Sequence, residues 1–339
     1  MNAQPLNVQD AIREFGDVLQ EAGLVLDGLP DMDDRLHRVT VEGDKGRERS
    51  GAYVGHLDAW PAGYVQNFRA GIKRNWKFSK GGLQLSAEER RQLQAETQRR
   101  QQEREAERQR LHERTAARLW RMVRAHAFRQ APIDHPYLVA KGLATSPRPL
   151  QDRDGNLAIM AYDIGGKLWS MQRIGPDGRK RFLHDGRING LHHVMRGRGW
   201  QYIDARRPLV IAEGWATGET IARLTGATVV VAFSSWNLEI VATEYRARFP
   251  KTLIVIAGDN DHRKPMEIGP DGQSKRNVGR EAAETAAAAV KGYAVLPEFA
   301  PDENGSDWND RMRRYGAALV KLELLAGFER AVSAFESGT

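Results

Sequence analysis

The sequence LVIAEG, residues 209–214, decides the fold: four apolar residues in a row end in a carboxylate and a glycine. Similar apolar runs without polar alternation follow at 228–232, 253–257 and 293–296. The stretches between the runs that have helical character are 216–225, 237–248 and 278–291. Continuous apolar strands that alternate with helices indicate a parallel sheet buried on both faces. We therefore predict an α/β fold here, with a mostly parallel sheet flanked by helices.

Carboxylates follow these predicted strands. Glu213 follows the first run directly, whereas Asp259 and Asp261 follow the run 253–257. Asp307 and Asp310 come after the last run. Ligands of open α/β sheets bind beyond the carboxyl ends of the strands, so we expect these side chains to meet there. Mg²⁺ usually takes one or two carboxylates together with phosphate oxygens of the substrate, which favours a protein that handles nucleotide or nucleic-acid phosphates. The alternative is that Asp259 and Asp261 only stabilise turns or helix ends.

Length and composition limit the other classes of protein. A chain of 339 residues favours two globular modules and a connector. The net charge of +7 favours a polyanionic partner. The chain has no cysteine, which excludes disulfides and thiolate zinc sites. No apolar run approaches the roughly 20 residues of a membrane span, and the first residues do not resemble a signal peptide, so we expect a cytoplasmic protein without a membrane partner.

Changes in composition divide the chain into segments. Residues 1–85 begin with an amphipathic helix at 6–24 and continue as a small β-rich module. Residues 86–115 consist almost entirely of Glu, Gln and Arg, which predicts an exposed helical linker. A mixed α+β subdomain is predicted at 116–203, with a helix at 116–127 and a β-meander at 157–196. The α/β domain is predicted at 204–316, and a C-terminal helix at 317–339 is expected to pack on its sheet or to dock a partner.

The acidic residues occur in a recognisable order. Glu213-Gly214 ends one strand, Asp259-Asn260-Asp261 follows another, and SDWND at 306–310 follows the last. This order resembles the Toprim domain of DnaG-type primases, topoisomerases, OLD-family nucleases and RecR repair proteins. Over about residues 130–316 the chain is similar to primases of plasmids and phages, including the TraC type of conjugative plasmids. The segments that carry this narrower likeness are 135–138, 141–142, 170–172, 180–183, 213–217 and 277–280.

The resemblance implies roles for the acidic residues. Glu213 would lie nearest to the chemistry, as a metal ligand or a general base. Asp259 and Asp261 would be the main metal ligands, and Asp307 and Asp310 would be further ligands. The implied cofactor is Mg²⁺ or Mn²⁺, as two ions, and not zinc; such a pair can activate a hydroxyl and stabilise a leaving pyrophosphate. The implied activity is that of a DNA primase, which makes short oligonucleotides on single-stranded DNA from nucleoside triphosphates (NTPs).

Basic residues near the carboxylates are candidates for contacts to nucleotides or DNA. Arginine and lysine bind phosphates without reading the base sequence. The candidates in the predicted meander and in the loop after Asp261 are Gln172, Arg173, Lys180, Arg181, Arg187, Lys264, Lys275 and Arg276. The alternative for each of them is a solvated position on the surface of a sheet.

The N-terminal module is a candidate for binding the template strand. DnaG-type primases usually begin with a zinc ribbon, which a chain without cysteine cannot build. Cations interleaved with aromatic rings are typical of single-strand binding, where rings stack on bases. The candidates are Arg47, Arg49, Tyr53, Tyr64, Lys73, Arg74 and Trp76. The alternative is that these aromatic residues fill the core of the small sheet.

Two other functions stay open. A small Toprim nuclease would use the same carboxylates, and a non-catalytic single-stranded-DNA-binding protein would keep the fold without the chemistry. The chain has no G-x-x-x-x-G-K-[ST] loop, so any helicase activity would come from a separate helicase or another replication or transfer protein.

Overall fold

The computed structural model describes residues 8–44, 46, 48–57, 60–79, 87–144, 148–195, 208–268 and 274–337. They fall into two compact units. The first is Met1–Arg104 with Met266–Lys275, and the second is Glu105–Pro265 with Arg276–Thr339.

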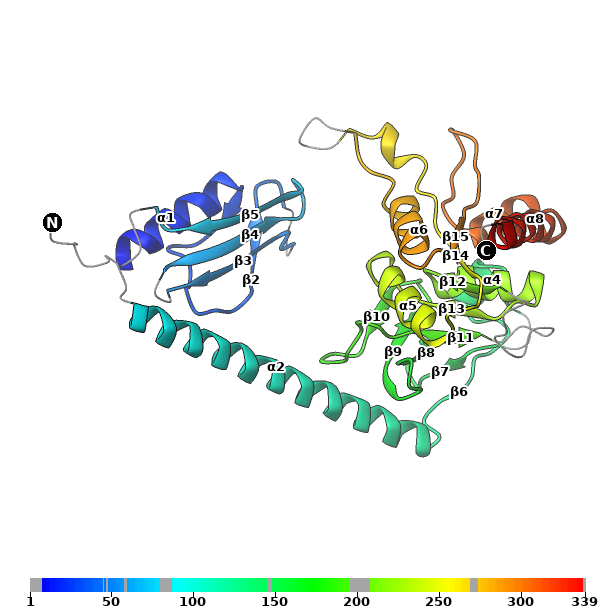
Figure 1. Cartoon of the computed structure of the whole chain (residues 1–339), viewed down its shortest axis with the longest axis horizontal. Coiled ribbons are helices and arrows are strands. Elements are labelled where there is room, and N and C mark those ends of the chain that lie inside the picture. Colours follow the sequence, from blue (N-terminus) through cyan, green and yellow to red (C-terminus); the bar gives the residue numbers. More distant parts are fainter. Residues whose placement is uncertain are drawn as a thin grey trace. The chain divides into compact units, whose positions relative to one another are not determined.

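The first unit is a helix packed on one face of an antiparallel sheet (Figure 1). The helix is α1 (Val8–Glu21), and the strands, in spatial order, are β1 (Leu24–Val25), β2 (His37–Val41), β3 (Gly51–His56), β4 (Ala62–Asn67) and β5 (Ile72–Lys77). Phe15 of α1 stacks on Trp76, with ring centroids 4.8 Å apart, and meets the edge of Tyr53. The predicted β-rich module is therefore present, and these rings form its core.

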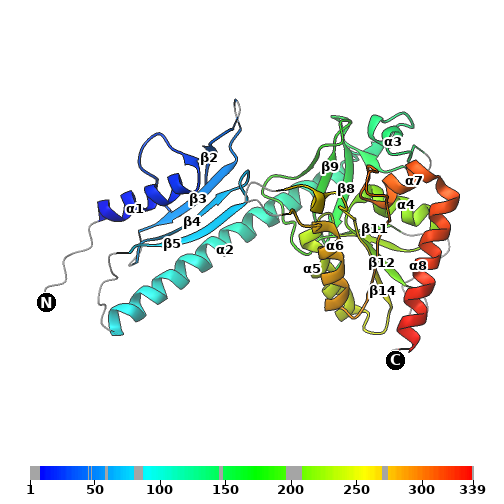
Figure 2. The same cartoon turned by 90° about the horizontal axis from the view of Figure 1, so that it is seen from above.

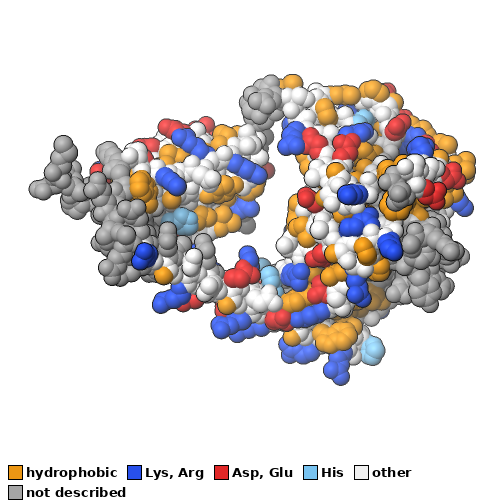
Figure 3. Space-filling model, in the orientation of Figure 1, with side chains coloured by type: hydrophobic (Ala, Val, Ile, Leu, Met, Phe, Trp, Pro, Cys, Tyr) orange, Lys and Arg blue, Asp and Glu red, His pale blue; other side chains and the backbone are white. Residues whose placement is uncertain are grey.

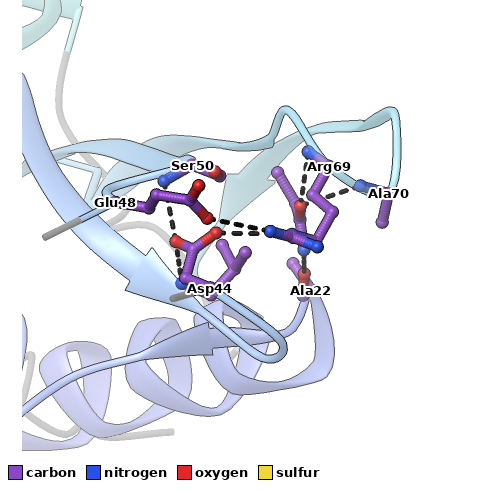
Figure 4. Close-up of polar contacts among 8 residues, drawn as sticks. Ala22, Asp44, Glu48, Ser50, Arg69 and Ala70 are labelled. Carbon is purple, nitrogen blue, oxygen red and sulfur yellow. Dashed lines mark hydrogen bonds and ion pairs between the residues drawn. The ribbon is translucent and has the colours of Figure 1, made fainter. Parts of the chain in front are cut away.

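A polar cluster fixes the loop between β2 and β3 (Figure 4). The Asp44 carboxylate accepts hydrogen bonds from the backbone amides of Val41 and Ser50, at 3.0 and 2.9 Å. Arg69 donates to Asp44 at 3.3 Å and to Glu48 at 3.0 Å. The bond from the Ser50 amide is the main reason that the pKa of Asp44 falls to about 2. The loop is thus held by hydrogen bonds of Asp44 within it and by ion pairs to Arg69, which lies between β4 and β5.

The predicted helical linker at 86–115 and the predicted helix at 116–127 are both helical, but they form one continuous helix, α2 (Ala87–Arg124). No glycine or proline interrupts this stretch, so the helix continues through Thr115. Its exposed face carries ion pairs such as Arg99–Glu103 at 3.2 Å, and Figure 3 shows acidic and basic side chains mixed along it. No helix among the described ranges is long and apolar enough to cross a membrane.

The second unit contains an antiparallel sheet and a mostly parallel one. The antiparallel sheet is ordered β10-β9-β8-β7-β6, with β6 (Arg129–Gln130), β7 (Leu150–Gln151), β8 (Leu157–Tyr162), β9 (Leu168–Ile174) and β10 (Lys180–Phe182). The other is ordered β11-β13-β12-β14-β15, with β11 (His193–Met195), β12 (Leu209–Ala212), β13 (Val229–Val231), β14 (Ile254–Ala257) and β15 (Tyr293–Val295). β11 pairs antiparallel with β13, so the predicted meander at 157–196 was wrong at its end: its last strand joins the second sheet.

Helices cover both faces of the parallel sheet (Figure 2). The helices α5 (Ser235–Arg248) and α6 (Val278–Ala289) pack on the face that presents Leu209 and Ile211. The opposite face presents Val210 and Ala212 and packs against α4 (Trp215–Thr225), α7 (Trp308–Tyr315) and α8 (Ala317–Ser337). Successive side chains of each strand therefore point into two different hydrophobic cores, which confirms the α/β prediction. The C-terminal helix α8 packs on the sheet through Leu324 and Phe328.

The core beneath α4 also joins the two sheets. It includes Leu138 of the short helix α3 (Pro136–Ala140) and Ile159 of β8, together with Val210 and Val229. The predicted segments 116–203 and 204–316 thus share one core, which brings the antiparallel sheet up against the carboxylate-bearing edge. Their boundary stays a prediction.

Candidate active site

The candidate site lies where the two central parallel strands end. Ala212 of β12 pairs with Ala257 of β14, so Glu213 and Gly258 leave neighbouring strands at the same level. Asp259 follows Gly258 directly, and this edge is where open α/β sheets bind ligands.

The Glu213 and Asp259 carboxylates lie close enough to influence each other's charge. Burial raises the pKa of Asp259 well above its ordinary value, and repulsion from Glu213, Asp307 and Asp261 raises it further. Burial also raises the pKa of Glu213, whereas Lys180 lowers it and Asp261 raises it again. Like charges in one desolvated place disfavour the ionised forms. The structure thus brings carboxylates from distant segments into one cluster, as the sequence predicts.

Helix N-termini anchor two of these carboxylates. Glu213 accepts a hydrogen bond from the backbone amide of Ser235, the first residue of α5. Asp261 accepts one from the amide of Gly279 in the first turn of α6, at 3.2 Å. The Asn277 side chain caps α6 and also accepts from the Asp261 amide, at 2.9 Å. Because helix N-termini favour negative charge, these contacts fix two carboxylates without neutralising them.

Asp307 and Asp310 lie at the start of α7 and share a lysine. Asp307 caps this helix by accepting from the Asp310 amide at 2.7 Å. The Lys141 ammonium lies 3.3 Å from Asp310 Oδ1 and 4.0 Å from Asp307 Oδ2. Burial raises the pKa of Asp307, repulsion from Asp310 adds to this, and Lys141 opposes both. Asp310 is thus engaged in an ion pair, and one oxygen of Asp307 is engaged as a cap.

The register of the antiparallel sheet separates the predicted basic residues into two sets. Gln172 pairs with Phe182, whose ring packs against the core under α4, so both face the parallel sheet. Lys180 lies on that same face, two residues from Phe182, and its ammonium lies 3.7 Å from where a Cβ on Gly214 would stand. Lys180 therefore reaches the carboxylate cluster, and Gln172 is buried on the same face of the sheet.

Arg173 and Arg181 face the opposite side of that sheet. They pair with each other across β9 and β10. The Arg173 guanidinium lies 2.9 Å from the buried carboxylate of Asp152. With Arg118 of α2 they line a groove of about 630 Å³. A strand alternates its side chains, so these arginines cannot reach the carboxylates that Lys180 faces.

Three of the remaining predicted cations, Arg187, Lys275 and Arg276, are engaged in local ion pairs. Arg187 lies 4.0 Å from Asp163 and stacks over the ring of Trp169. Lys275 pairs with Glu267 at 2.6 Å, and Arg276 pairs with Glu281 of α6. Lys264 begins the single-turn 3₁₀ helix Lys264–Met266 and is exposed. Their roles as nucleotide contacts stay predictions.

The N-terminal candidates divide between core and surface. Tyr53 and Trp76 are buried against α1, so the prediction that their rings stack on bases was wrong: a core ring has no free face for a base. Arg74 pairs with Glu21 of α1 at 2.9 Å. Tyr64 is half-buried and Lys73 is exposed, both on the sheet face away from the helix. Arg49 is exposed in the loop before β3, and Arg47 lies outside the described residues.

The chemistry of the cluster fits a divalent cation. Asp259 Oδ1 is buried and has no hydrogen-bond partner, which leaves a carboxylate oxygen available as a ligand. Within the described ranges, no group of three or more His, Asp or Glu side chains is arranged so that it could hold a metal ion. Mg²⁺ usually completes its shell with waters and substrate phosphates around one or two carboxylates. The residues present therefore suit Mg²⁺ or Mn²⁺ delivered with a nucleotide.

Three contributors to the site were not predicted as site residues. Lys141 lies beside the α7 carboxylates but is separated from Asp310 by 169 residues. Asn277 and the Ser235 amide act through helix starts, which carry only a weak local signal. Asn277 at the start of an apolar helical stretch is a recognisable N-cap and could have been identified. A single lysine after a short helix gives no such signal.

Comparison with known families identifies the segment that carries the cluster. Residues 208–318 match the Toprim domain. The chain is also 42% identical over 295 residues to DNA primase TraC of Escherichia coli, which covers 86% of this chain and 27% of that protein. A second E. coli DNA primase TraC is 41% identical over 297 residues, or 86% of this chain and 20% of that protein. The predicted Toprim fold and the likeness to plasmid-type primases are confirmed, although the chain spans only about a quarter of these relatives' length.

Solved primase structures align more loosely. A chain from a complex of bacteriophage T7 lagging-strand DNA polymerase with primase domains covers 60% of this chain and 93% of its own length, at 13% identity and a TM-score of 0.38. The DnaG primase catalytic domain bound to ssDNA covers 60% of this chain and 63% of its own length, at 15% identity and a TM-score of 0.34.

Proposed function

We propose that this chain is the catalytic part of a DNA primase that makes short oligonucleotides on single-stranded DNA from NTPs. The observation that carries the proposal is the meeting of Glu213, Asp259, Asp261 and Asp307 at one sheet edge, in a segment that matches the Toprim domain. The likeness to DNA primase TraC over 86% of the chain supports the same reaction.

The proposed cofactor is a pair of Mg²⁺ or Mn²⁺ ions. Asp259 and Asp261 would hold them, with Glu213 and Asp307 as neighbouring ligands. Bound cations of this kind lower the pKa of an attacking hydroxyl and stabilise the charge of a leaving pyrophosphate. Asp310 is the weakest candidate ligand, because Lys141 already neutralises it.

The chain's own residues would position and balance these charges. The starts of α5 and α6 orient Glu213 and Asp261, so the carboxylates are placed before substrate arrives. Lys180, on the opposite sheet, faces the cluster and is suited to hold a phosphate of the incoming nucleotide. Burial raises the pKa of Glu213 at the end of β12, which suits a metal ligand or a general base for the 3′-hydroxyl.

Primer synthesis on an unprimed template tests the proposal. Full-length chain, single-stranded DNA, Mg²⁺ and labelled NTPs are incubated together, with EDTA and the Asp259→Asn variant as controls. We expect labelled oligonucleotides that disappear with EDTA and with the variant and return with Mg²⁺ or Mn²⁺. Strand cutting without synthesis would identify a Toprim nuclease instead, and DNA binding alone would identify a non-catalytic binding protein.

The proposed partners follow from the same reaction. They are single-stranded DNA, NTPs and a separate helicase or other replication or transfer protein, in the cytoplasm. In this proposal the N-terminal unit holds the template strand.

A further inference from the structure

The sheet of the N-terminal unit has one face covered by α1 and a second face that points away from this helix, here called the open face. Tyr53, Val65 and Trp76 point toward α1 and form the core. Their strand neighbours point the other way because successive side chains alternate. The register aligns two rows across this second face: Arg38, Ala52, Gln66 and Lys73 form one row, and Val54, Tyr64 and Asn75 form the next.

Charge is distributed unevenly between the two sides of this unit. The helix side carries the carboxylates of α1, namely Asp10, Glu14, Asp17 and Glu21. The strands of the open face contribute Arg38, Lys73 and Lys77 and no Asp or Glu. One acid beside this face, Asp34, is hydrogen-bonded to His56.

Neighbouring cations on β5 show the same division. Arg74 points to the helix side and is paired with Glu21 at 2.9 Å. Lys73 and Lys77 point to the open face, and neither has an ion-pair partner among the described residues. These ammonium groups can therefore bind an anion without first breaking a contact within the protein.

Aromatic rings accompany the cations on the open face. Phe68, at the end of β4, is 46% exposed, and the Arg38 guanidinium lies 4.5 Å from its ring centroid. The half-buried Tyr64 lies in the middle of the face and donates its hydroxyl hydrogen to Gln66 at 2.9 Å. Rings for stacking and cations for phosphates are what a single strand of nucleic acid requires.

We infer that the open face of the N-terminal sheet binds single-stranded DNA, with Tyr64 and Phe68 stacking on bases and Arg38, Lys73 and Lys77 binding phosphates. In this inference the stacking role passes from Tyr53 and Trp76, whose rings are buried, to Tyr64 and Phe68, whose rings a base can reach. The strand is the template only if the proposed primase function holds; the binding face itself does not depend on that function.

Fluorescence anisotropy of full-length protein with a labelled single-stranded oligonucleotide tests the inference. The first variant removes two cations from the open face (Lys73→Ala with Lys77→Ala), and its matched control removes two from the helix side (Arg13→Ala with Arg74→Ala). Each lost phosphate contact lowers the dependence of log K on log salt by about 0.7. We expect a loss of about 1.4 in slope for the first variant and none for the control. Equal slopes for both variants would overturn the inference.

Substitutions of the rings test stacking separately from charge. Tyr64→Ala with Phe68→Ala is expected to weaken binding by at least about 5-fold, because each of the two lost stacking contacts contributes about 1–3 kcal/mol. Tyr64→Phe keeps the ring and loses the bond to Gln66, so its affinity should be unchanged. Unchanged affinity of the double alanine variant, or an equal loss for duplex DNA, would contradict the inference. Circular dichroism verifies that each variant is folded.

Primer synthesis by the same variants separates the two proposals. If the wild type makes primers and the open-face variants bind DNA normally, the inference that the open face binds DNA is wrong and the proposed primase function is supported. If the wild type makes no primers while the open-face variants lose DNA binding, the open face binds DNA as inferred and the proposed primase function is wrong.

Discussion

Gly279 offers a direct way to displace the candidate site by a small, known amount. It lies in the first turn of α6 against the backbone of Asp259, and its amide donates to Asp261. A Cβ at this position would stand 2.8 Å from the Asp259 carbonyl oxygen and 3.1 Å from the Asp259 Cβ. Non-bonded carbon contacts are optimal at about 3.5–4.0 Å, so Gly279→Ala must move Asp259 by roughly half an ångström.

The displacement gives a magnitude for the loss of activity. A misplacement of about 1 Å at an active site can cost about 100-fold in rate, so half of that predicts a fall of about ten-fold in kcat. Stability should change less, because overpacking costs about 1–3 kcal/mol while alanine is favoured over glycine in a helix by about 1 kcal/mol. Steady-state primer synthesis measures kcat, and thermal unfolding measures stability.

Gly327 of α8 provides the matched control. A Cβ there would stand 2.8 Å from Val295 Cγ1, an equally short contact that involves a side chain in the core instead of the Asp259 backbone. Gly327→Ala should therefore lower the free energy of unfolding to a similar degree while kcat stays unchanged. Unchanged kcat in a folded Gly279→Ala variant, or equal losses of kcat in both variants, would refute the reasoning that the α6 start positions the carboxylates.

Three further outcomes are expected. Asp259→Asn and Asp261→Asn should each abolish synthesis but leave single-strand affinity within about two-fold, since phosphate contacts to cations dominate such binding; an equal loss of affinity would contradict this. Lys180→Gln should raise KM for NTPs and lower kcat, whereas Arg181→Gln, on the opposite face of the same strand, should leave both kinetic constants unchanged. Burial lowers the pKa of His192 to about 4 from its ordinary 6.5, so its contribution to stability should be lost as pH falls from 6.5 toward 4, by up to about 3 kcal/mol. Denaturant unfolding of wild type and His192→Gln over this pH range measures the contribution of His192 to the free energy of unfolding. If both proteins lose stability in parallel as the pH falls, protonation of His192 does not contribute to the loss.

The parallel sheet was predictable because burial on both faces leaves an unbroken apolar run. The runs at 209–212 and 253–257 are too short for buried helices and fit strands of a covered sheet, and the carboxylates after them then share one edge. The end of the meander was not predictable in this way. His193 to Met195 is too short to show which of two sheets it joins, and the pairing with β13 depends on tertiary packing.

Which of the basic side chains face the carboxylates could be decided only from the register of the strands. Lys180 and Arg181 are adjacent in the sequence, yet one faces the carboxylates and the other faces α2, and composition alone cannot assign them. The rings of the N-terminal module posed the same problem. Trp76 and Tyr64 have similar surroundings in the sequence, but only the position of α1 decides that Trp76 is core and Tyr64 is surface.

Divalent-cation binding tests the central claim that the carboxylates form one pocket. Electron paramagnetic resonance measures free Mn²⁺ as it is titrated into the full-length chain with single-stranded DNA and a non-hydrolysable NTP analogue. Mn²⁺ should bind equally to the wild type and to Glu303→Gln, a control at a carboxylate that is held by Arg314 instead of by the cluster. It should bind at least about ten-fold more weakly to Asp259→Asn, which corresponds to a loss of about 1.4 kcal/mol of binding free energy. Equal Mn²⁺ affinity of Asp259→Asn and wild type would contradict the claim.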